Sequence, residues 1–373
     1  MNIAVDARVL GTGRAIDNYT KNLLNALFTI DSKNNYFLFV DDPKKAEALS
    51  GNFHTITVTS KKVLKDHFWF FKNIFYFDLM FHPDNTEHLL CLPKSVVTVH
   101  DVMPWVNPDI IFSKNILVKL RQQFYYLLQK EALSSSSKII TVTKSSKKDI
   151  EKYLGIADSR IEVTYESVGE EFKKLEEAKI SKFRSERKLA APFLFYVGGF
   201  DTRKNVLVVL EAFKEISALL PKLMLVLAGS FEVSNLKGGN QFPALKKYVV
   251  ENHLTEKVQF TGYVSDQDLV YYYNAAECFV YPSLYEGFGL PVLEALNCGA
   301  AVVCSNSSSL PEVVGEAGLQ FTPDNKEELV LSLKKVLTDG QLRESLQNKA
   351  LLQAKKFSWE KVAQKTLEVF ESL

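Results

Sequence analysis

The sequence predicts an α/β protein of two domains, each built around a parallel sheet. Short apolar runs alternate with glycine-containing loops and helical patterns, as expected for strand–loop–helix units. This alternation occurs twice, and a polar, charged stretch that begins near residue 169 separates the two series. A length of 373 residues also suits two domains better than one.

The first series covers residues 1–168. The apolar runs predict strands at 2–5, 36–40, 55–59, 78–83, 95–99, 138–143 and 161–164. We expect helices at 16–27, at the amphipathic stretch 119–133, and from residues 143–145 toward residue 154. Ser145 is the expected cap of the last of these, with contact to a substrate as the alternative. Residues 61–81 are rich in aromatic residues and lysines. We favour a helix that packs into the core, with a membrane-facing tip or a base-stacking surface as alternatives.

The second series covers residues 191–356, after a predicted linker and solvated helix at 169–190. Strands are expected at 193–197, 223–228, 258–260, 278–282 and 300–304. Helices are expected at 205–216, 268–274 and 291–298, and two more within 326–355. A short turn is expected at 310–314. A last helix is expected within residues 357–373, at 360–370.

The stretch 285–299, YEGFGLPVLEALNCG, carries the strongest functional signal. It predicts a glycine-rich loop followed by a helix, with Pro291 in the first turn. Such a loop offers backbone N–H groups to a phosphate at the carboxyl edge of a sheet. Glu286 and Glu294 flank it, which suits a ligand that also presents hydroxyl groups. Alternatively, Glu294 stabilises the helix dipole and Glu286 is solvated.

Other polar residues follow predicted strands. His100 and Asp101 end one strand, with His82 as a weaker candidate, and Arg203 and Lys204 follow a glycine turn. Two adjacent cations suit a diphosphate, although such a pair before a helix is also common in solvated turns.

Several of these segments resemble one family. EGFGLPVLE contains two glutamates with seven residues between them, and it occurs with RKN at 203–205, FTGYVS at 260–265 and VHD at 99–101. Together they resemble retaining nucleotide-sugar glycosyltransferases of family 4. This resemblance implies the GT-B architecture, in which two Rossmann-like domains face each other across a cleft and the last helix crosses back to the first domain.

The resemblance also implies roles for particular residues. His100, Asp101 and Glu286 would be catalytic, with Glu286 facing the donor sugar and Glu294 binding the ribose. The donor would be bound by Gly13, Arg14, Arg203, Lys204, Gly262, Tyr263, Val264, Gly287, Phe288, Gly289, Leu290 and Glu294. The first loop departs from the family pattern. In many relatives an aromatic residue directly follows the arginine, whereas here four residues separate Arg14 from Tyr19.

The expected activity is transfer of a hexose, by preference mannose, from GDP-mannose or a UDP-sugar to a glycan or a lipid-linked saccharide, as in polysaccharide biosynthesis. The sequence has no CxxC, His cluster or DxD triplet, so we expect neither a metal nor another cofactor. Alternatives are a nucleotide-sugar epimerase or phosphorylase, and a non-catalytic sugar-nucleotide or glycan-binding protein.

Composition bears on the binding partners and the location of the protein. The net charge of +1 gives no basic field for nucleic acid. The four cysteines and the absence of an apolar leader or span predict a cytoplasmic protein. Peripheral contact with the inner face of the cell membrane stays open.

Overall fold

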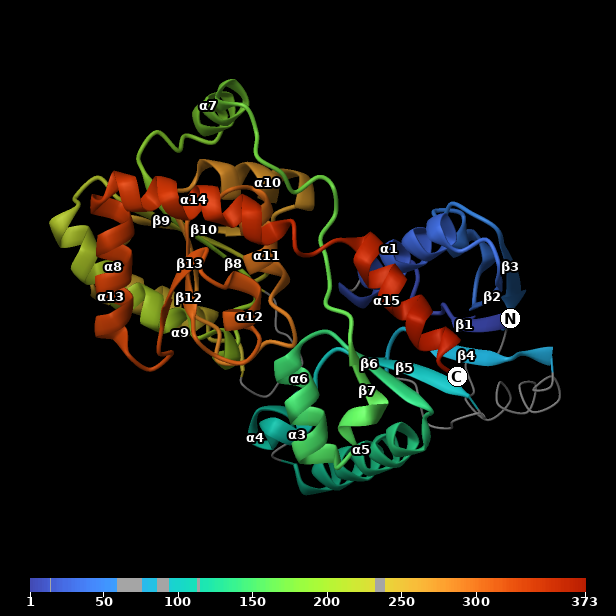
Figure 1. Cartoon of the computed structure of the whole chain (residues 1–373). Helices are drawn as coiled ribbons and strands as arrows, with labels where there is room; N and C mark the ends of the chain where they lie inside the picture. The colour runs from blue at the N-terminus through green and yellow to red at the C-terminus, as the bar shows by residue number, and fades with distance from the viewer. Residues whose placement is uncertain (14, 59–75, 86–93, 113–114, 232–238) are drawn as a thin grey trace. The chain divides into compact units, whose positions relative to one another are not determined.

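The computed structural model contains two compact α/β units (Figure 1). Unit 1 consists of Met1–Val106, Phe112–Ser167 and Phe357–Leu373, and unit 2 consists of Asn107–Ile111 and Val168–Lys356. The structure describes all residues except 14, 59–75, 86–93, 113–114 and 232–238. Arg14, Cys91 and most of the aromatic stretch 61–81 therefore lie outside the described residues.

Unit 1 is built around a seven-stranded parallel sheet with the order β3-β2-β1-β4-β5-β6-β7. Its strands are β1 (Asn2–Asp6), β2 (Asn35–Val40), β3 (Phe53–Thr57), β4 (Leu79–His82), β5 (Ser95–Val99), β6 (Lys138–Thr141) and β7 (Ile161–Val163). The strand expected at 55–59 begins two residues earlier, because β3 pairs with β2 from Phe53 onward.

Helices cover both faces of this sheet. The helices of unit 1 are α1 (Ala15–Ile30), α3 (Met103–Val106), α5 (Ile116–Ser135), α6 (Lys144–Asp149) and α15 (Trp359–Glu371), with a 3-10 turn at Pro43–Ala46 and a π turn at Ile150–Leu154. Successive strand residues point to opposite faces. Accordingly, Ile3 and Val96 pack with α1 and α15, whereas Val97 packs with Leu133 of α5.

The last helix belongs to unit 1, as the sequence predicted. In α15, Val362 and Phe370 are buried in the core that α1 also covers. The two helices lie side by side (Figure 1). Trp359 packs at the edge of this core, against the Tyr19 ring.

The cap of α6 differs from the prediction. The hydroxyl of Thr143 accepts a hydrogen bond from the Ser146 N–H at 3.0 Å, so Thr143 rather than Ser145 caps this helix. Thr143 has the extended backbone that an N-cap residue requires, whereas Ser145 is already helical.

Unit 2 is built around a six-stranded parallel sheet with the order β10-β9-β8-β11-β12-β13. Its strands are β8 (Phe193–Val197), β9 (Met224–Ala228), β10 (Val258–Gly262), β11 (Cys278–Tyr281), β12 (Val302–Ser305) and β13 (Gly318–Phe321). The sequence analysis missed β13, which is short and has one fully buried large residue, Phe321.

The helices of unit 2 are α4 (Pro108–Ile111), α7 (Glu177–Glu186), α8 (Val206–Leu219), α9 (Phe242–Glu251), α10 (Asp266–Ala275), α11 (Leu290–Asn297), α12 (Leu310–Val314), α13 (Lys326–Thr338) and α14 (Gly340–Ala354). Helix α12 occupies the expected turn at 310–314. Helix α7 lies in the expected linker, but it packs on α10 by stacking Phe183 on Tyr271. The stretch 169–190 is therefore part of unit 2.

Each sheet has one point where the strand order reverses. In unit 1 this point lies between β1 and β4, and in unit 2 it lies between β8 and β11. The loops that leave the carboxyl ends of two such strands turn to opposite faces, which leaves a crevice where open α/β sheets bind ligands. We call these two places the switch points.

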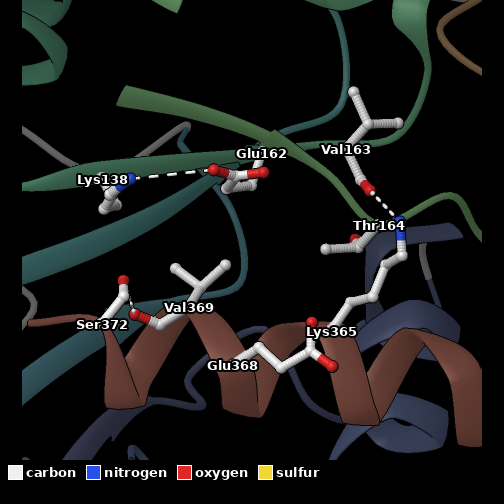
Figure 2. A pocket seen from close by; sticks show the side chains of 8 residues that line it. All are labelled: Lys138, Glu162, Val163, Thr164, Lys365, Glu368, Val369 and Ser372. Atoms are coloured by element: carbon white, nitrogen blue, oxygen red, sulfur yellow. Dashed lines mark hydrogen bonds and ion pairs between the residues drawn. The ribbon is translucent and has the colours of Figure 1, made fainter. Parts of the chain in front are cut away.

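A cavity of about 210 Å³ lies elsewhere in unit 1, between the edge strand β7 and α15 (Figure 2). Lys365 Nζ donates to the Val163 carbonyl at 3.4 Å, and Lys138 lies 3.7 Å from Glu162. Lys365 thus pairs with the backbone of the edge strand, and Lys138 pairs with a carboxylate on it. Charged residues there are a common protection against edge-to-edge pairing, so we assign the cavity a structural role.

Two further observations concern membranes and cysteines. None of the described helices combines the length and the apolar character needed to cross a bilayer. Cys278, Cys298 and Cys304 are buried free thiols.

Candidate functional site

Glu286 is the centre of a buried polar cluster at the switch point of unit 2. Its Oε1 accepts hydrogen bonds from Lys204 Nζ at 2.7 Å, Ser283 Oγ at 2.6 Å and Tyr281 Oη at 3.1 Å. Arg203 Nη1 lies 2.9 Å from the same oxygen. The cations follow β8 and the carboxylate follows β11, so folding joins residues more than 80 positions apart.

The cluster keeps Glu286 ionised. Burial opposes ionisation, but Lys204 and Arg203 outweigh it and lower the Glu286 pKa to about 2. Burial lowers the Lys204 pKa, and the pairing with Glu286 opposes this shift. Arg203 also donates to the Tyr285 carbonyl at 3.0 Å, while its Nε is buried without a hydrogen bond. This Nε lies 3.7 Å from Asp201 Oδ1, so carboxylates on two sides hold the guanidinium in place.

A serine-rich loop after β12 fixes the backbone of the Glu286 loop. The Glu286 N–H donates to Ser308 Oγ at 2.8 Å, and Ser309 Oγ donates to the Phe288 carbonyl at 2.7 Å. Ser305 and Ser307 donate to the carbonyls of Ser283 and Leu284. These bonds pre-organise the loop, because each backbone group has a fixed partner.

Close packing requires a glycine at position 289, the N-cap of α11. Gly289 is the N-cap residue and has φ of 103°, and a Cβ there would lie 2.6 Å from Leu310 Cδ2. Leu290 opens the helix, with Pro291 behind it, and Phe288 is buried. Gly289 is therefore required by its positive φ and by its contact with Leu310.

Glu294 lies in the middle of α11 rather than in its first turn, so the dipole interpretation does not apply. Its Oε2 accepts a hydrogen bond from Tyr273 Oη at 2.7 Å. Burial raises the Glu294 pKa to about 7. The hydrogen bond from Tyr273 lowers this pKa, whereas the negative charges of Asp266 and Glu171 raise it further. Near neutral pH this carboxyl group is therefore partly protonated and can donate as well as accept.

The loop after β10 contains the remaining donor candidates of unit 2. The Gly262 carbonyl accepts from the Gly229 N–H at 2.9 Å, which ties this loop to the one after β9. Tyr263 is 80% exposed and Val264 is half-buried. An exposed aromatic ring beside a fixed backbone turn is available for stacking against a planar ligand.

His100 follows β5 in unit 1 and is held from both sides. Its Nδ1 lies 2.7 Å from Glu166 Oε1, and its Nε2 lies 3.0 Å from the Pro83 carbonyl oxygen. Both neighbours are acceptors, so both hydrogen bonds form only with a doubly protonated imidazolium. Burial opposes this charge, but Glu166 outweighs it and the His100 pKa is raised. The Tyr19 ring packs edge-on against the imidazole.

The other candidates of unit 1 have simpler surroundings. Asp101 accepts from the Met103 N–H at 2.9 Å, at the start of α3. The Gly13 N–H donates to Asp17 at 2.8 Å, and Arg14 lies outside the described residues.

A second cluster occupies the switch point of unit 1. Asp6, at the end of β1, accepts from Nε and Nη2 of Arg8 at 2.8 Å and 2.5 Å. His82, at the end of β4, lies 3.7 Å from Asp6 Oδ2. Burial opposes ionisation of Asp6, but Arg8 and His82 outweigh it and lower its pKa. His82, a weaker candidate in the sequence, therefore lies beside a buried carboxylate.

Comparison with known proteins identifies the family. The family model described as "Glycosyl transferases group 1" matches residues 177–353. O-antigen chain mannosyltransferase B of Escherichia coli is 33% identical over 304 residues, which cover 80% of this chain and 75% of that protein. The chain belongs to the glycosyl transferases group 1 family.

Other relatives of this glycosyltransferase are longer. A serotype-specific mannosyltransferase of E. coli, WbdA, is 30% identical over 283 residues, and the chain spans about a third of its length (75% of this chain, 34% of WbdA).

Solved structures support the GT-B fold. Sucrose-phosphate synthase from Thermosynechococcus elongatus matches with a TM-score of 0.77, at 19% identity over 100% of this chain and 98% of that one. HepE from Anabaena, solved with UDP and glucose, matches with a TM-score of 0.76, at 17% identity and full coverage of both chains. The predicted GT-B architecture is confirmed.

The clusters of the two units contain further residues that the sequence did not indicate. They are Glu166, Asp201, Tyr273, Tyr281, Ser283, Ser308 and Ser309, which contact the predicted residues listed above. Ser283 could have been noticed, because it lies three residues before Glu286. Glu166 and Tyr273 gave no local signal, because their partners are 66 and 21 positions away.

The described part of the glycosyltransferase contains no group of three or more His, Cys, Asp or Glu side chains that could hold a metal ion. Its charged site groups are instead mixed pairs of cations and carboxylates.

Proposed function

We propose that this glycosyltransferase transfers a hexose, mannose by preference, from a nucleotide-diphosphate sugar to a glycan or lipid-linked saccharide. The observation that supports it most is the convergence of Arg203, Lys204 and Glu286 at the switch point of unit 2. The mannosyltransferase relatives favour mannose, and hence GDP-mannose as donor. We propose that the enzyme acts in the cytoplasm.

In this proposal the diphosphate lies against Arg203, Lys204 and the N–H groups of the Gly287–Gly289 loop. The guanidinium of Arg203 is held beside the ammonium of Lys204, which has three N–H groups, so two fixed cations face the same carboxylate. As the bond to the sugar breaks, negative charge grows on the leaving phosphate, and fixed cations stabilise that charge without reorganisation. This supports a metal-independent reaction.

Glu286 serves two purposes in the proposal. Without ligand it neutralises and orients the two cations, at 2.7 Å and 2.9 Å. When the diphosphate takes over those cations, the carboxylate stabilises the positive charge that develops on the sugar. Glu294, with Tyr273 behind it, binds the ribose hydroxyls, and Tyr263 and the Gly262 backbone contact the base.

The transfer retains the configuration of the sugar in this proposal. When the diphosphate takes over the two cations, Tyr281 and Ser283 still donate to Glu286 Oε1, which lowers the nucleophilicity of that oxygen. A same-face displacement, in which the leaving phosphate accepts the proton of the acceptor hydroxyl, needs no protein nucleophile. His100, with Asp101 beside it, would contact the transferred sugar by exchanging the Nε2 hydrogen bond to the Pro83 carbonyl for one to a sugar hydroxyl.

The test is to incubate the purified protein with GDP-mannose and with UDP-hexoses, with and without a mannose-containing acceptor, in chelator. We expect nucleoside diphosphate release only with acceptor, and an NMR spectrum that shows the donor's anomeric configuration in the product. Isomerised donor without acceptor would indicate an epimerase, and release of a sugar phosphate a phosphorylase. Inversion, or activity only with added divalent metal, would contradict the corresponding part of the proposal.

A further inference from the structure

Helix α5 exposes apolar side chains that amphipathic helices usually bury. Of the 17 large hydrophobic side chains that are exposed among the described residues, seven belong to this one helix. Leu117 is 74% exposed and Phe124 is 62% exposed. Single exposed hydrophobic residues need no explanation, but a contiguous apolar patch indicates a binding surface.

The inner side of α5 fixes the orientation of the helix. Gln129, Ala132 and Leu133 are buried, and Leu133 packs into the core beneath β5 and β6. Gln129 Nε2 donates to the Asn85 carbonyl, and the Tyr126 ring packs against Trp105. The side that contacts the sheet is thus partly polar and aromatic.

The outer side forms one stripe. Ile116, Leu120, Phe124, Leu127 and Leu128 follow a spacing of four, four, three and one, with Leu117 beside them, which places them on one helix face. We call these six residues the apolar face of α5. The helix lies on the opposite side of the sheet from α1 and α15 (Figure 1).

The charges along α5 are asymmetric. Between residues 112 and 130 the sequence contains no Asp or Glu, whereas Lys119 and Arg121 lie within the apolar stretch. Arg121 is exposed and Lys119 is half-buried. The acidic residue of the helix, Glu131, comes after the apolar face. Leucine and phenylalanine on one face, flanked by cations, are typical of helices that lie in the headgroup region of a membrane.

We propose that the apolar face of α5 binds the surface of an anionic lipid bilayer. The face would enter the boundary between headgroups and acyl chains, while Lys119 and Arg121 reach the lipid phosphates. A second copy of the chain is a poorer occupant, because two such faces would bring the same cations together. With 20 residues, α5 is about 30 Å long and would lie flat rather than cross the bilayer.

This proposal places the membrane contact on a different element from the aromatic stretch 61–81. It deepens the proposed function by bringing the enzyme to the surface that displays lipid-linked acceptors. Only the access to lipid-linked acceptors rests on the proposed function, because binding to vesicles needs neither a sugar donor nor an acceptor.

The test is co-sedimentation of the full chain with vesicles of phosphatidylcholine alone or mixed with phosphatidylglycerol. We compare the parent with Leu120→Ser/Phe124→Ser, with Lys119→Glu/Arg121→Glu, and with the control Leu331→Ser/Leu352→Ser. The control residues are exposed on α13 and α14 of unit 2. Thermal melting verifies that each variant folds, and size-exclusion chromatography gives the oligomeric state.

We expect binding to the anionic vesicles only, weakened by salt. The apolar variant should bind the anionic vesicles about tenfold or more weakly, since burial of each leucine or phenylalanine side chain raises the affinity by a comparable factor. The charge variant should lose binding, and the control should keep it. Failure of the parent to sediment, or equal binding by parent and apolar variant, would overturn the proposal. So would a parent dimer that the apolar variant converts to monomer. Transfer to a water-soluble acceptor should be unchanged in all variants, so its loss would concern the proposed function instead.

Discussion

The two switch points contain similar side chains, but the chain assembles them in different ways. In unit 1, Asp6 is paired by Arg8, two residues further along, and His82 joins from the neighbouring strand end. In unit 2, Glu286 is paired by Arg203 and Lys204, which lie more than 80 positions away. The first pair forms locally, whereas the second exists only when β8 and β11 are adjacent.

The surroundings differ as well. At the unit 2 switch point a glycine loop, the start of α11 and two adjacent cations lie together. At the unit 1 switch point both carboxylate oxygens of Asp6 are occupied by one arginine. The difference suggests that unit 2 receives the anionic part of the donor. The following predictions test this assignment, from the largest expected effect to the smallest.

Glu286→Gln should lower the turnover number by about 10³-fold, as for removal of a charge that stabilises a transition state. The affinity for the nucleoside diphosphate should be equal or higher, because the substitution frees Arg203 and Lys204 from their carboxylate. Steady-state rates and calorimetric titration measure the two quantities. Asp6→Asn is the matched variant in unit 1 and should leave nucleotide affinity unchanged. A loss of nucleotide affinity in Glu286→Gln would mean that the carboxylate binds the nucleotide directly.

Arg203→Ala should weaken binding of the nucleoside diphosphate by about 100-fold, since two hydrogen bonds to a charged group are lost. Arg8→Ala, which removes the corresponding cation of unit 1, should leave this affinity unchanged. Calorimetry at constant salt compares the two variants, with melting curves to verify folding. Equal losses in both would remove the distinction between the switch points.

Glu294→Gln should change the pH dependence of folding stability. The Glu294 pKa is raised to about 7, so its charged form disfavours the folded state, and stability is lost as pH rises from about 4.5 to 7. That difference in pKa corresponds to at most roughly 3 kcal/mol, and we expect about 2 kcal/mol because the side chain is only partly buried.

The glutamine variant should therefore be more stable than the parent at pH 8 and equal near pH 4. Denaturant unfolding across this range measures the free energy. Glu344→Gln, on the exposed side of α14, is the control. A parallel pH dependence in parent and Glu294→Gln would show that Glu294 ionises freely.

Glu166→Gln should lower kcat/KM by about tenfold, because His100 loses the carboxylate that keeps it charged and oriented. The His100 pKa is raised in the folded state, so the stability from this pair is present below pH 6.5 and is lost as pH rises through the higher pKa. The variant should lose activity at a lower pH than the parent. NMR titration of the imidazole follows the pKa itself, and an unchanged titration would reduce Glu166 to a packing role.

The sequence predicted the α/β alternation and the glycine loop because both depend on local patterns. It predicted Arg203, Lys204 and Glu286 as separate site residues, but their direct pairing depends on which strands are neighbours. The cap of α6 was assigned to Ser145 because a serine and a threonine look alike there, and only backbone geometry selects Thr143. The apolar face of α5 escaped prediction because periodicity shows that a helix has two faces but not which one meets the sheet.

Unit 1 is discontinuous in the chain, and this affects the order in which the protein can fold during synthesis. Val362 and Phe370 of α15 complete the core that Ile3 and Val96 begin. All of Val168–Lys356 is made between these two parts. Unit 2 can therefore close its core on the ribosome while one face of the unit 1 sheet is covered by α1 but still lacks α15. Until α15 is made, the apolar residues that it covers stay exposed in the first half of the chain. This half therefore depends on chaperones more than the second half does.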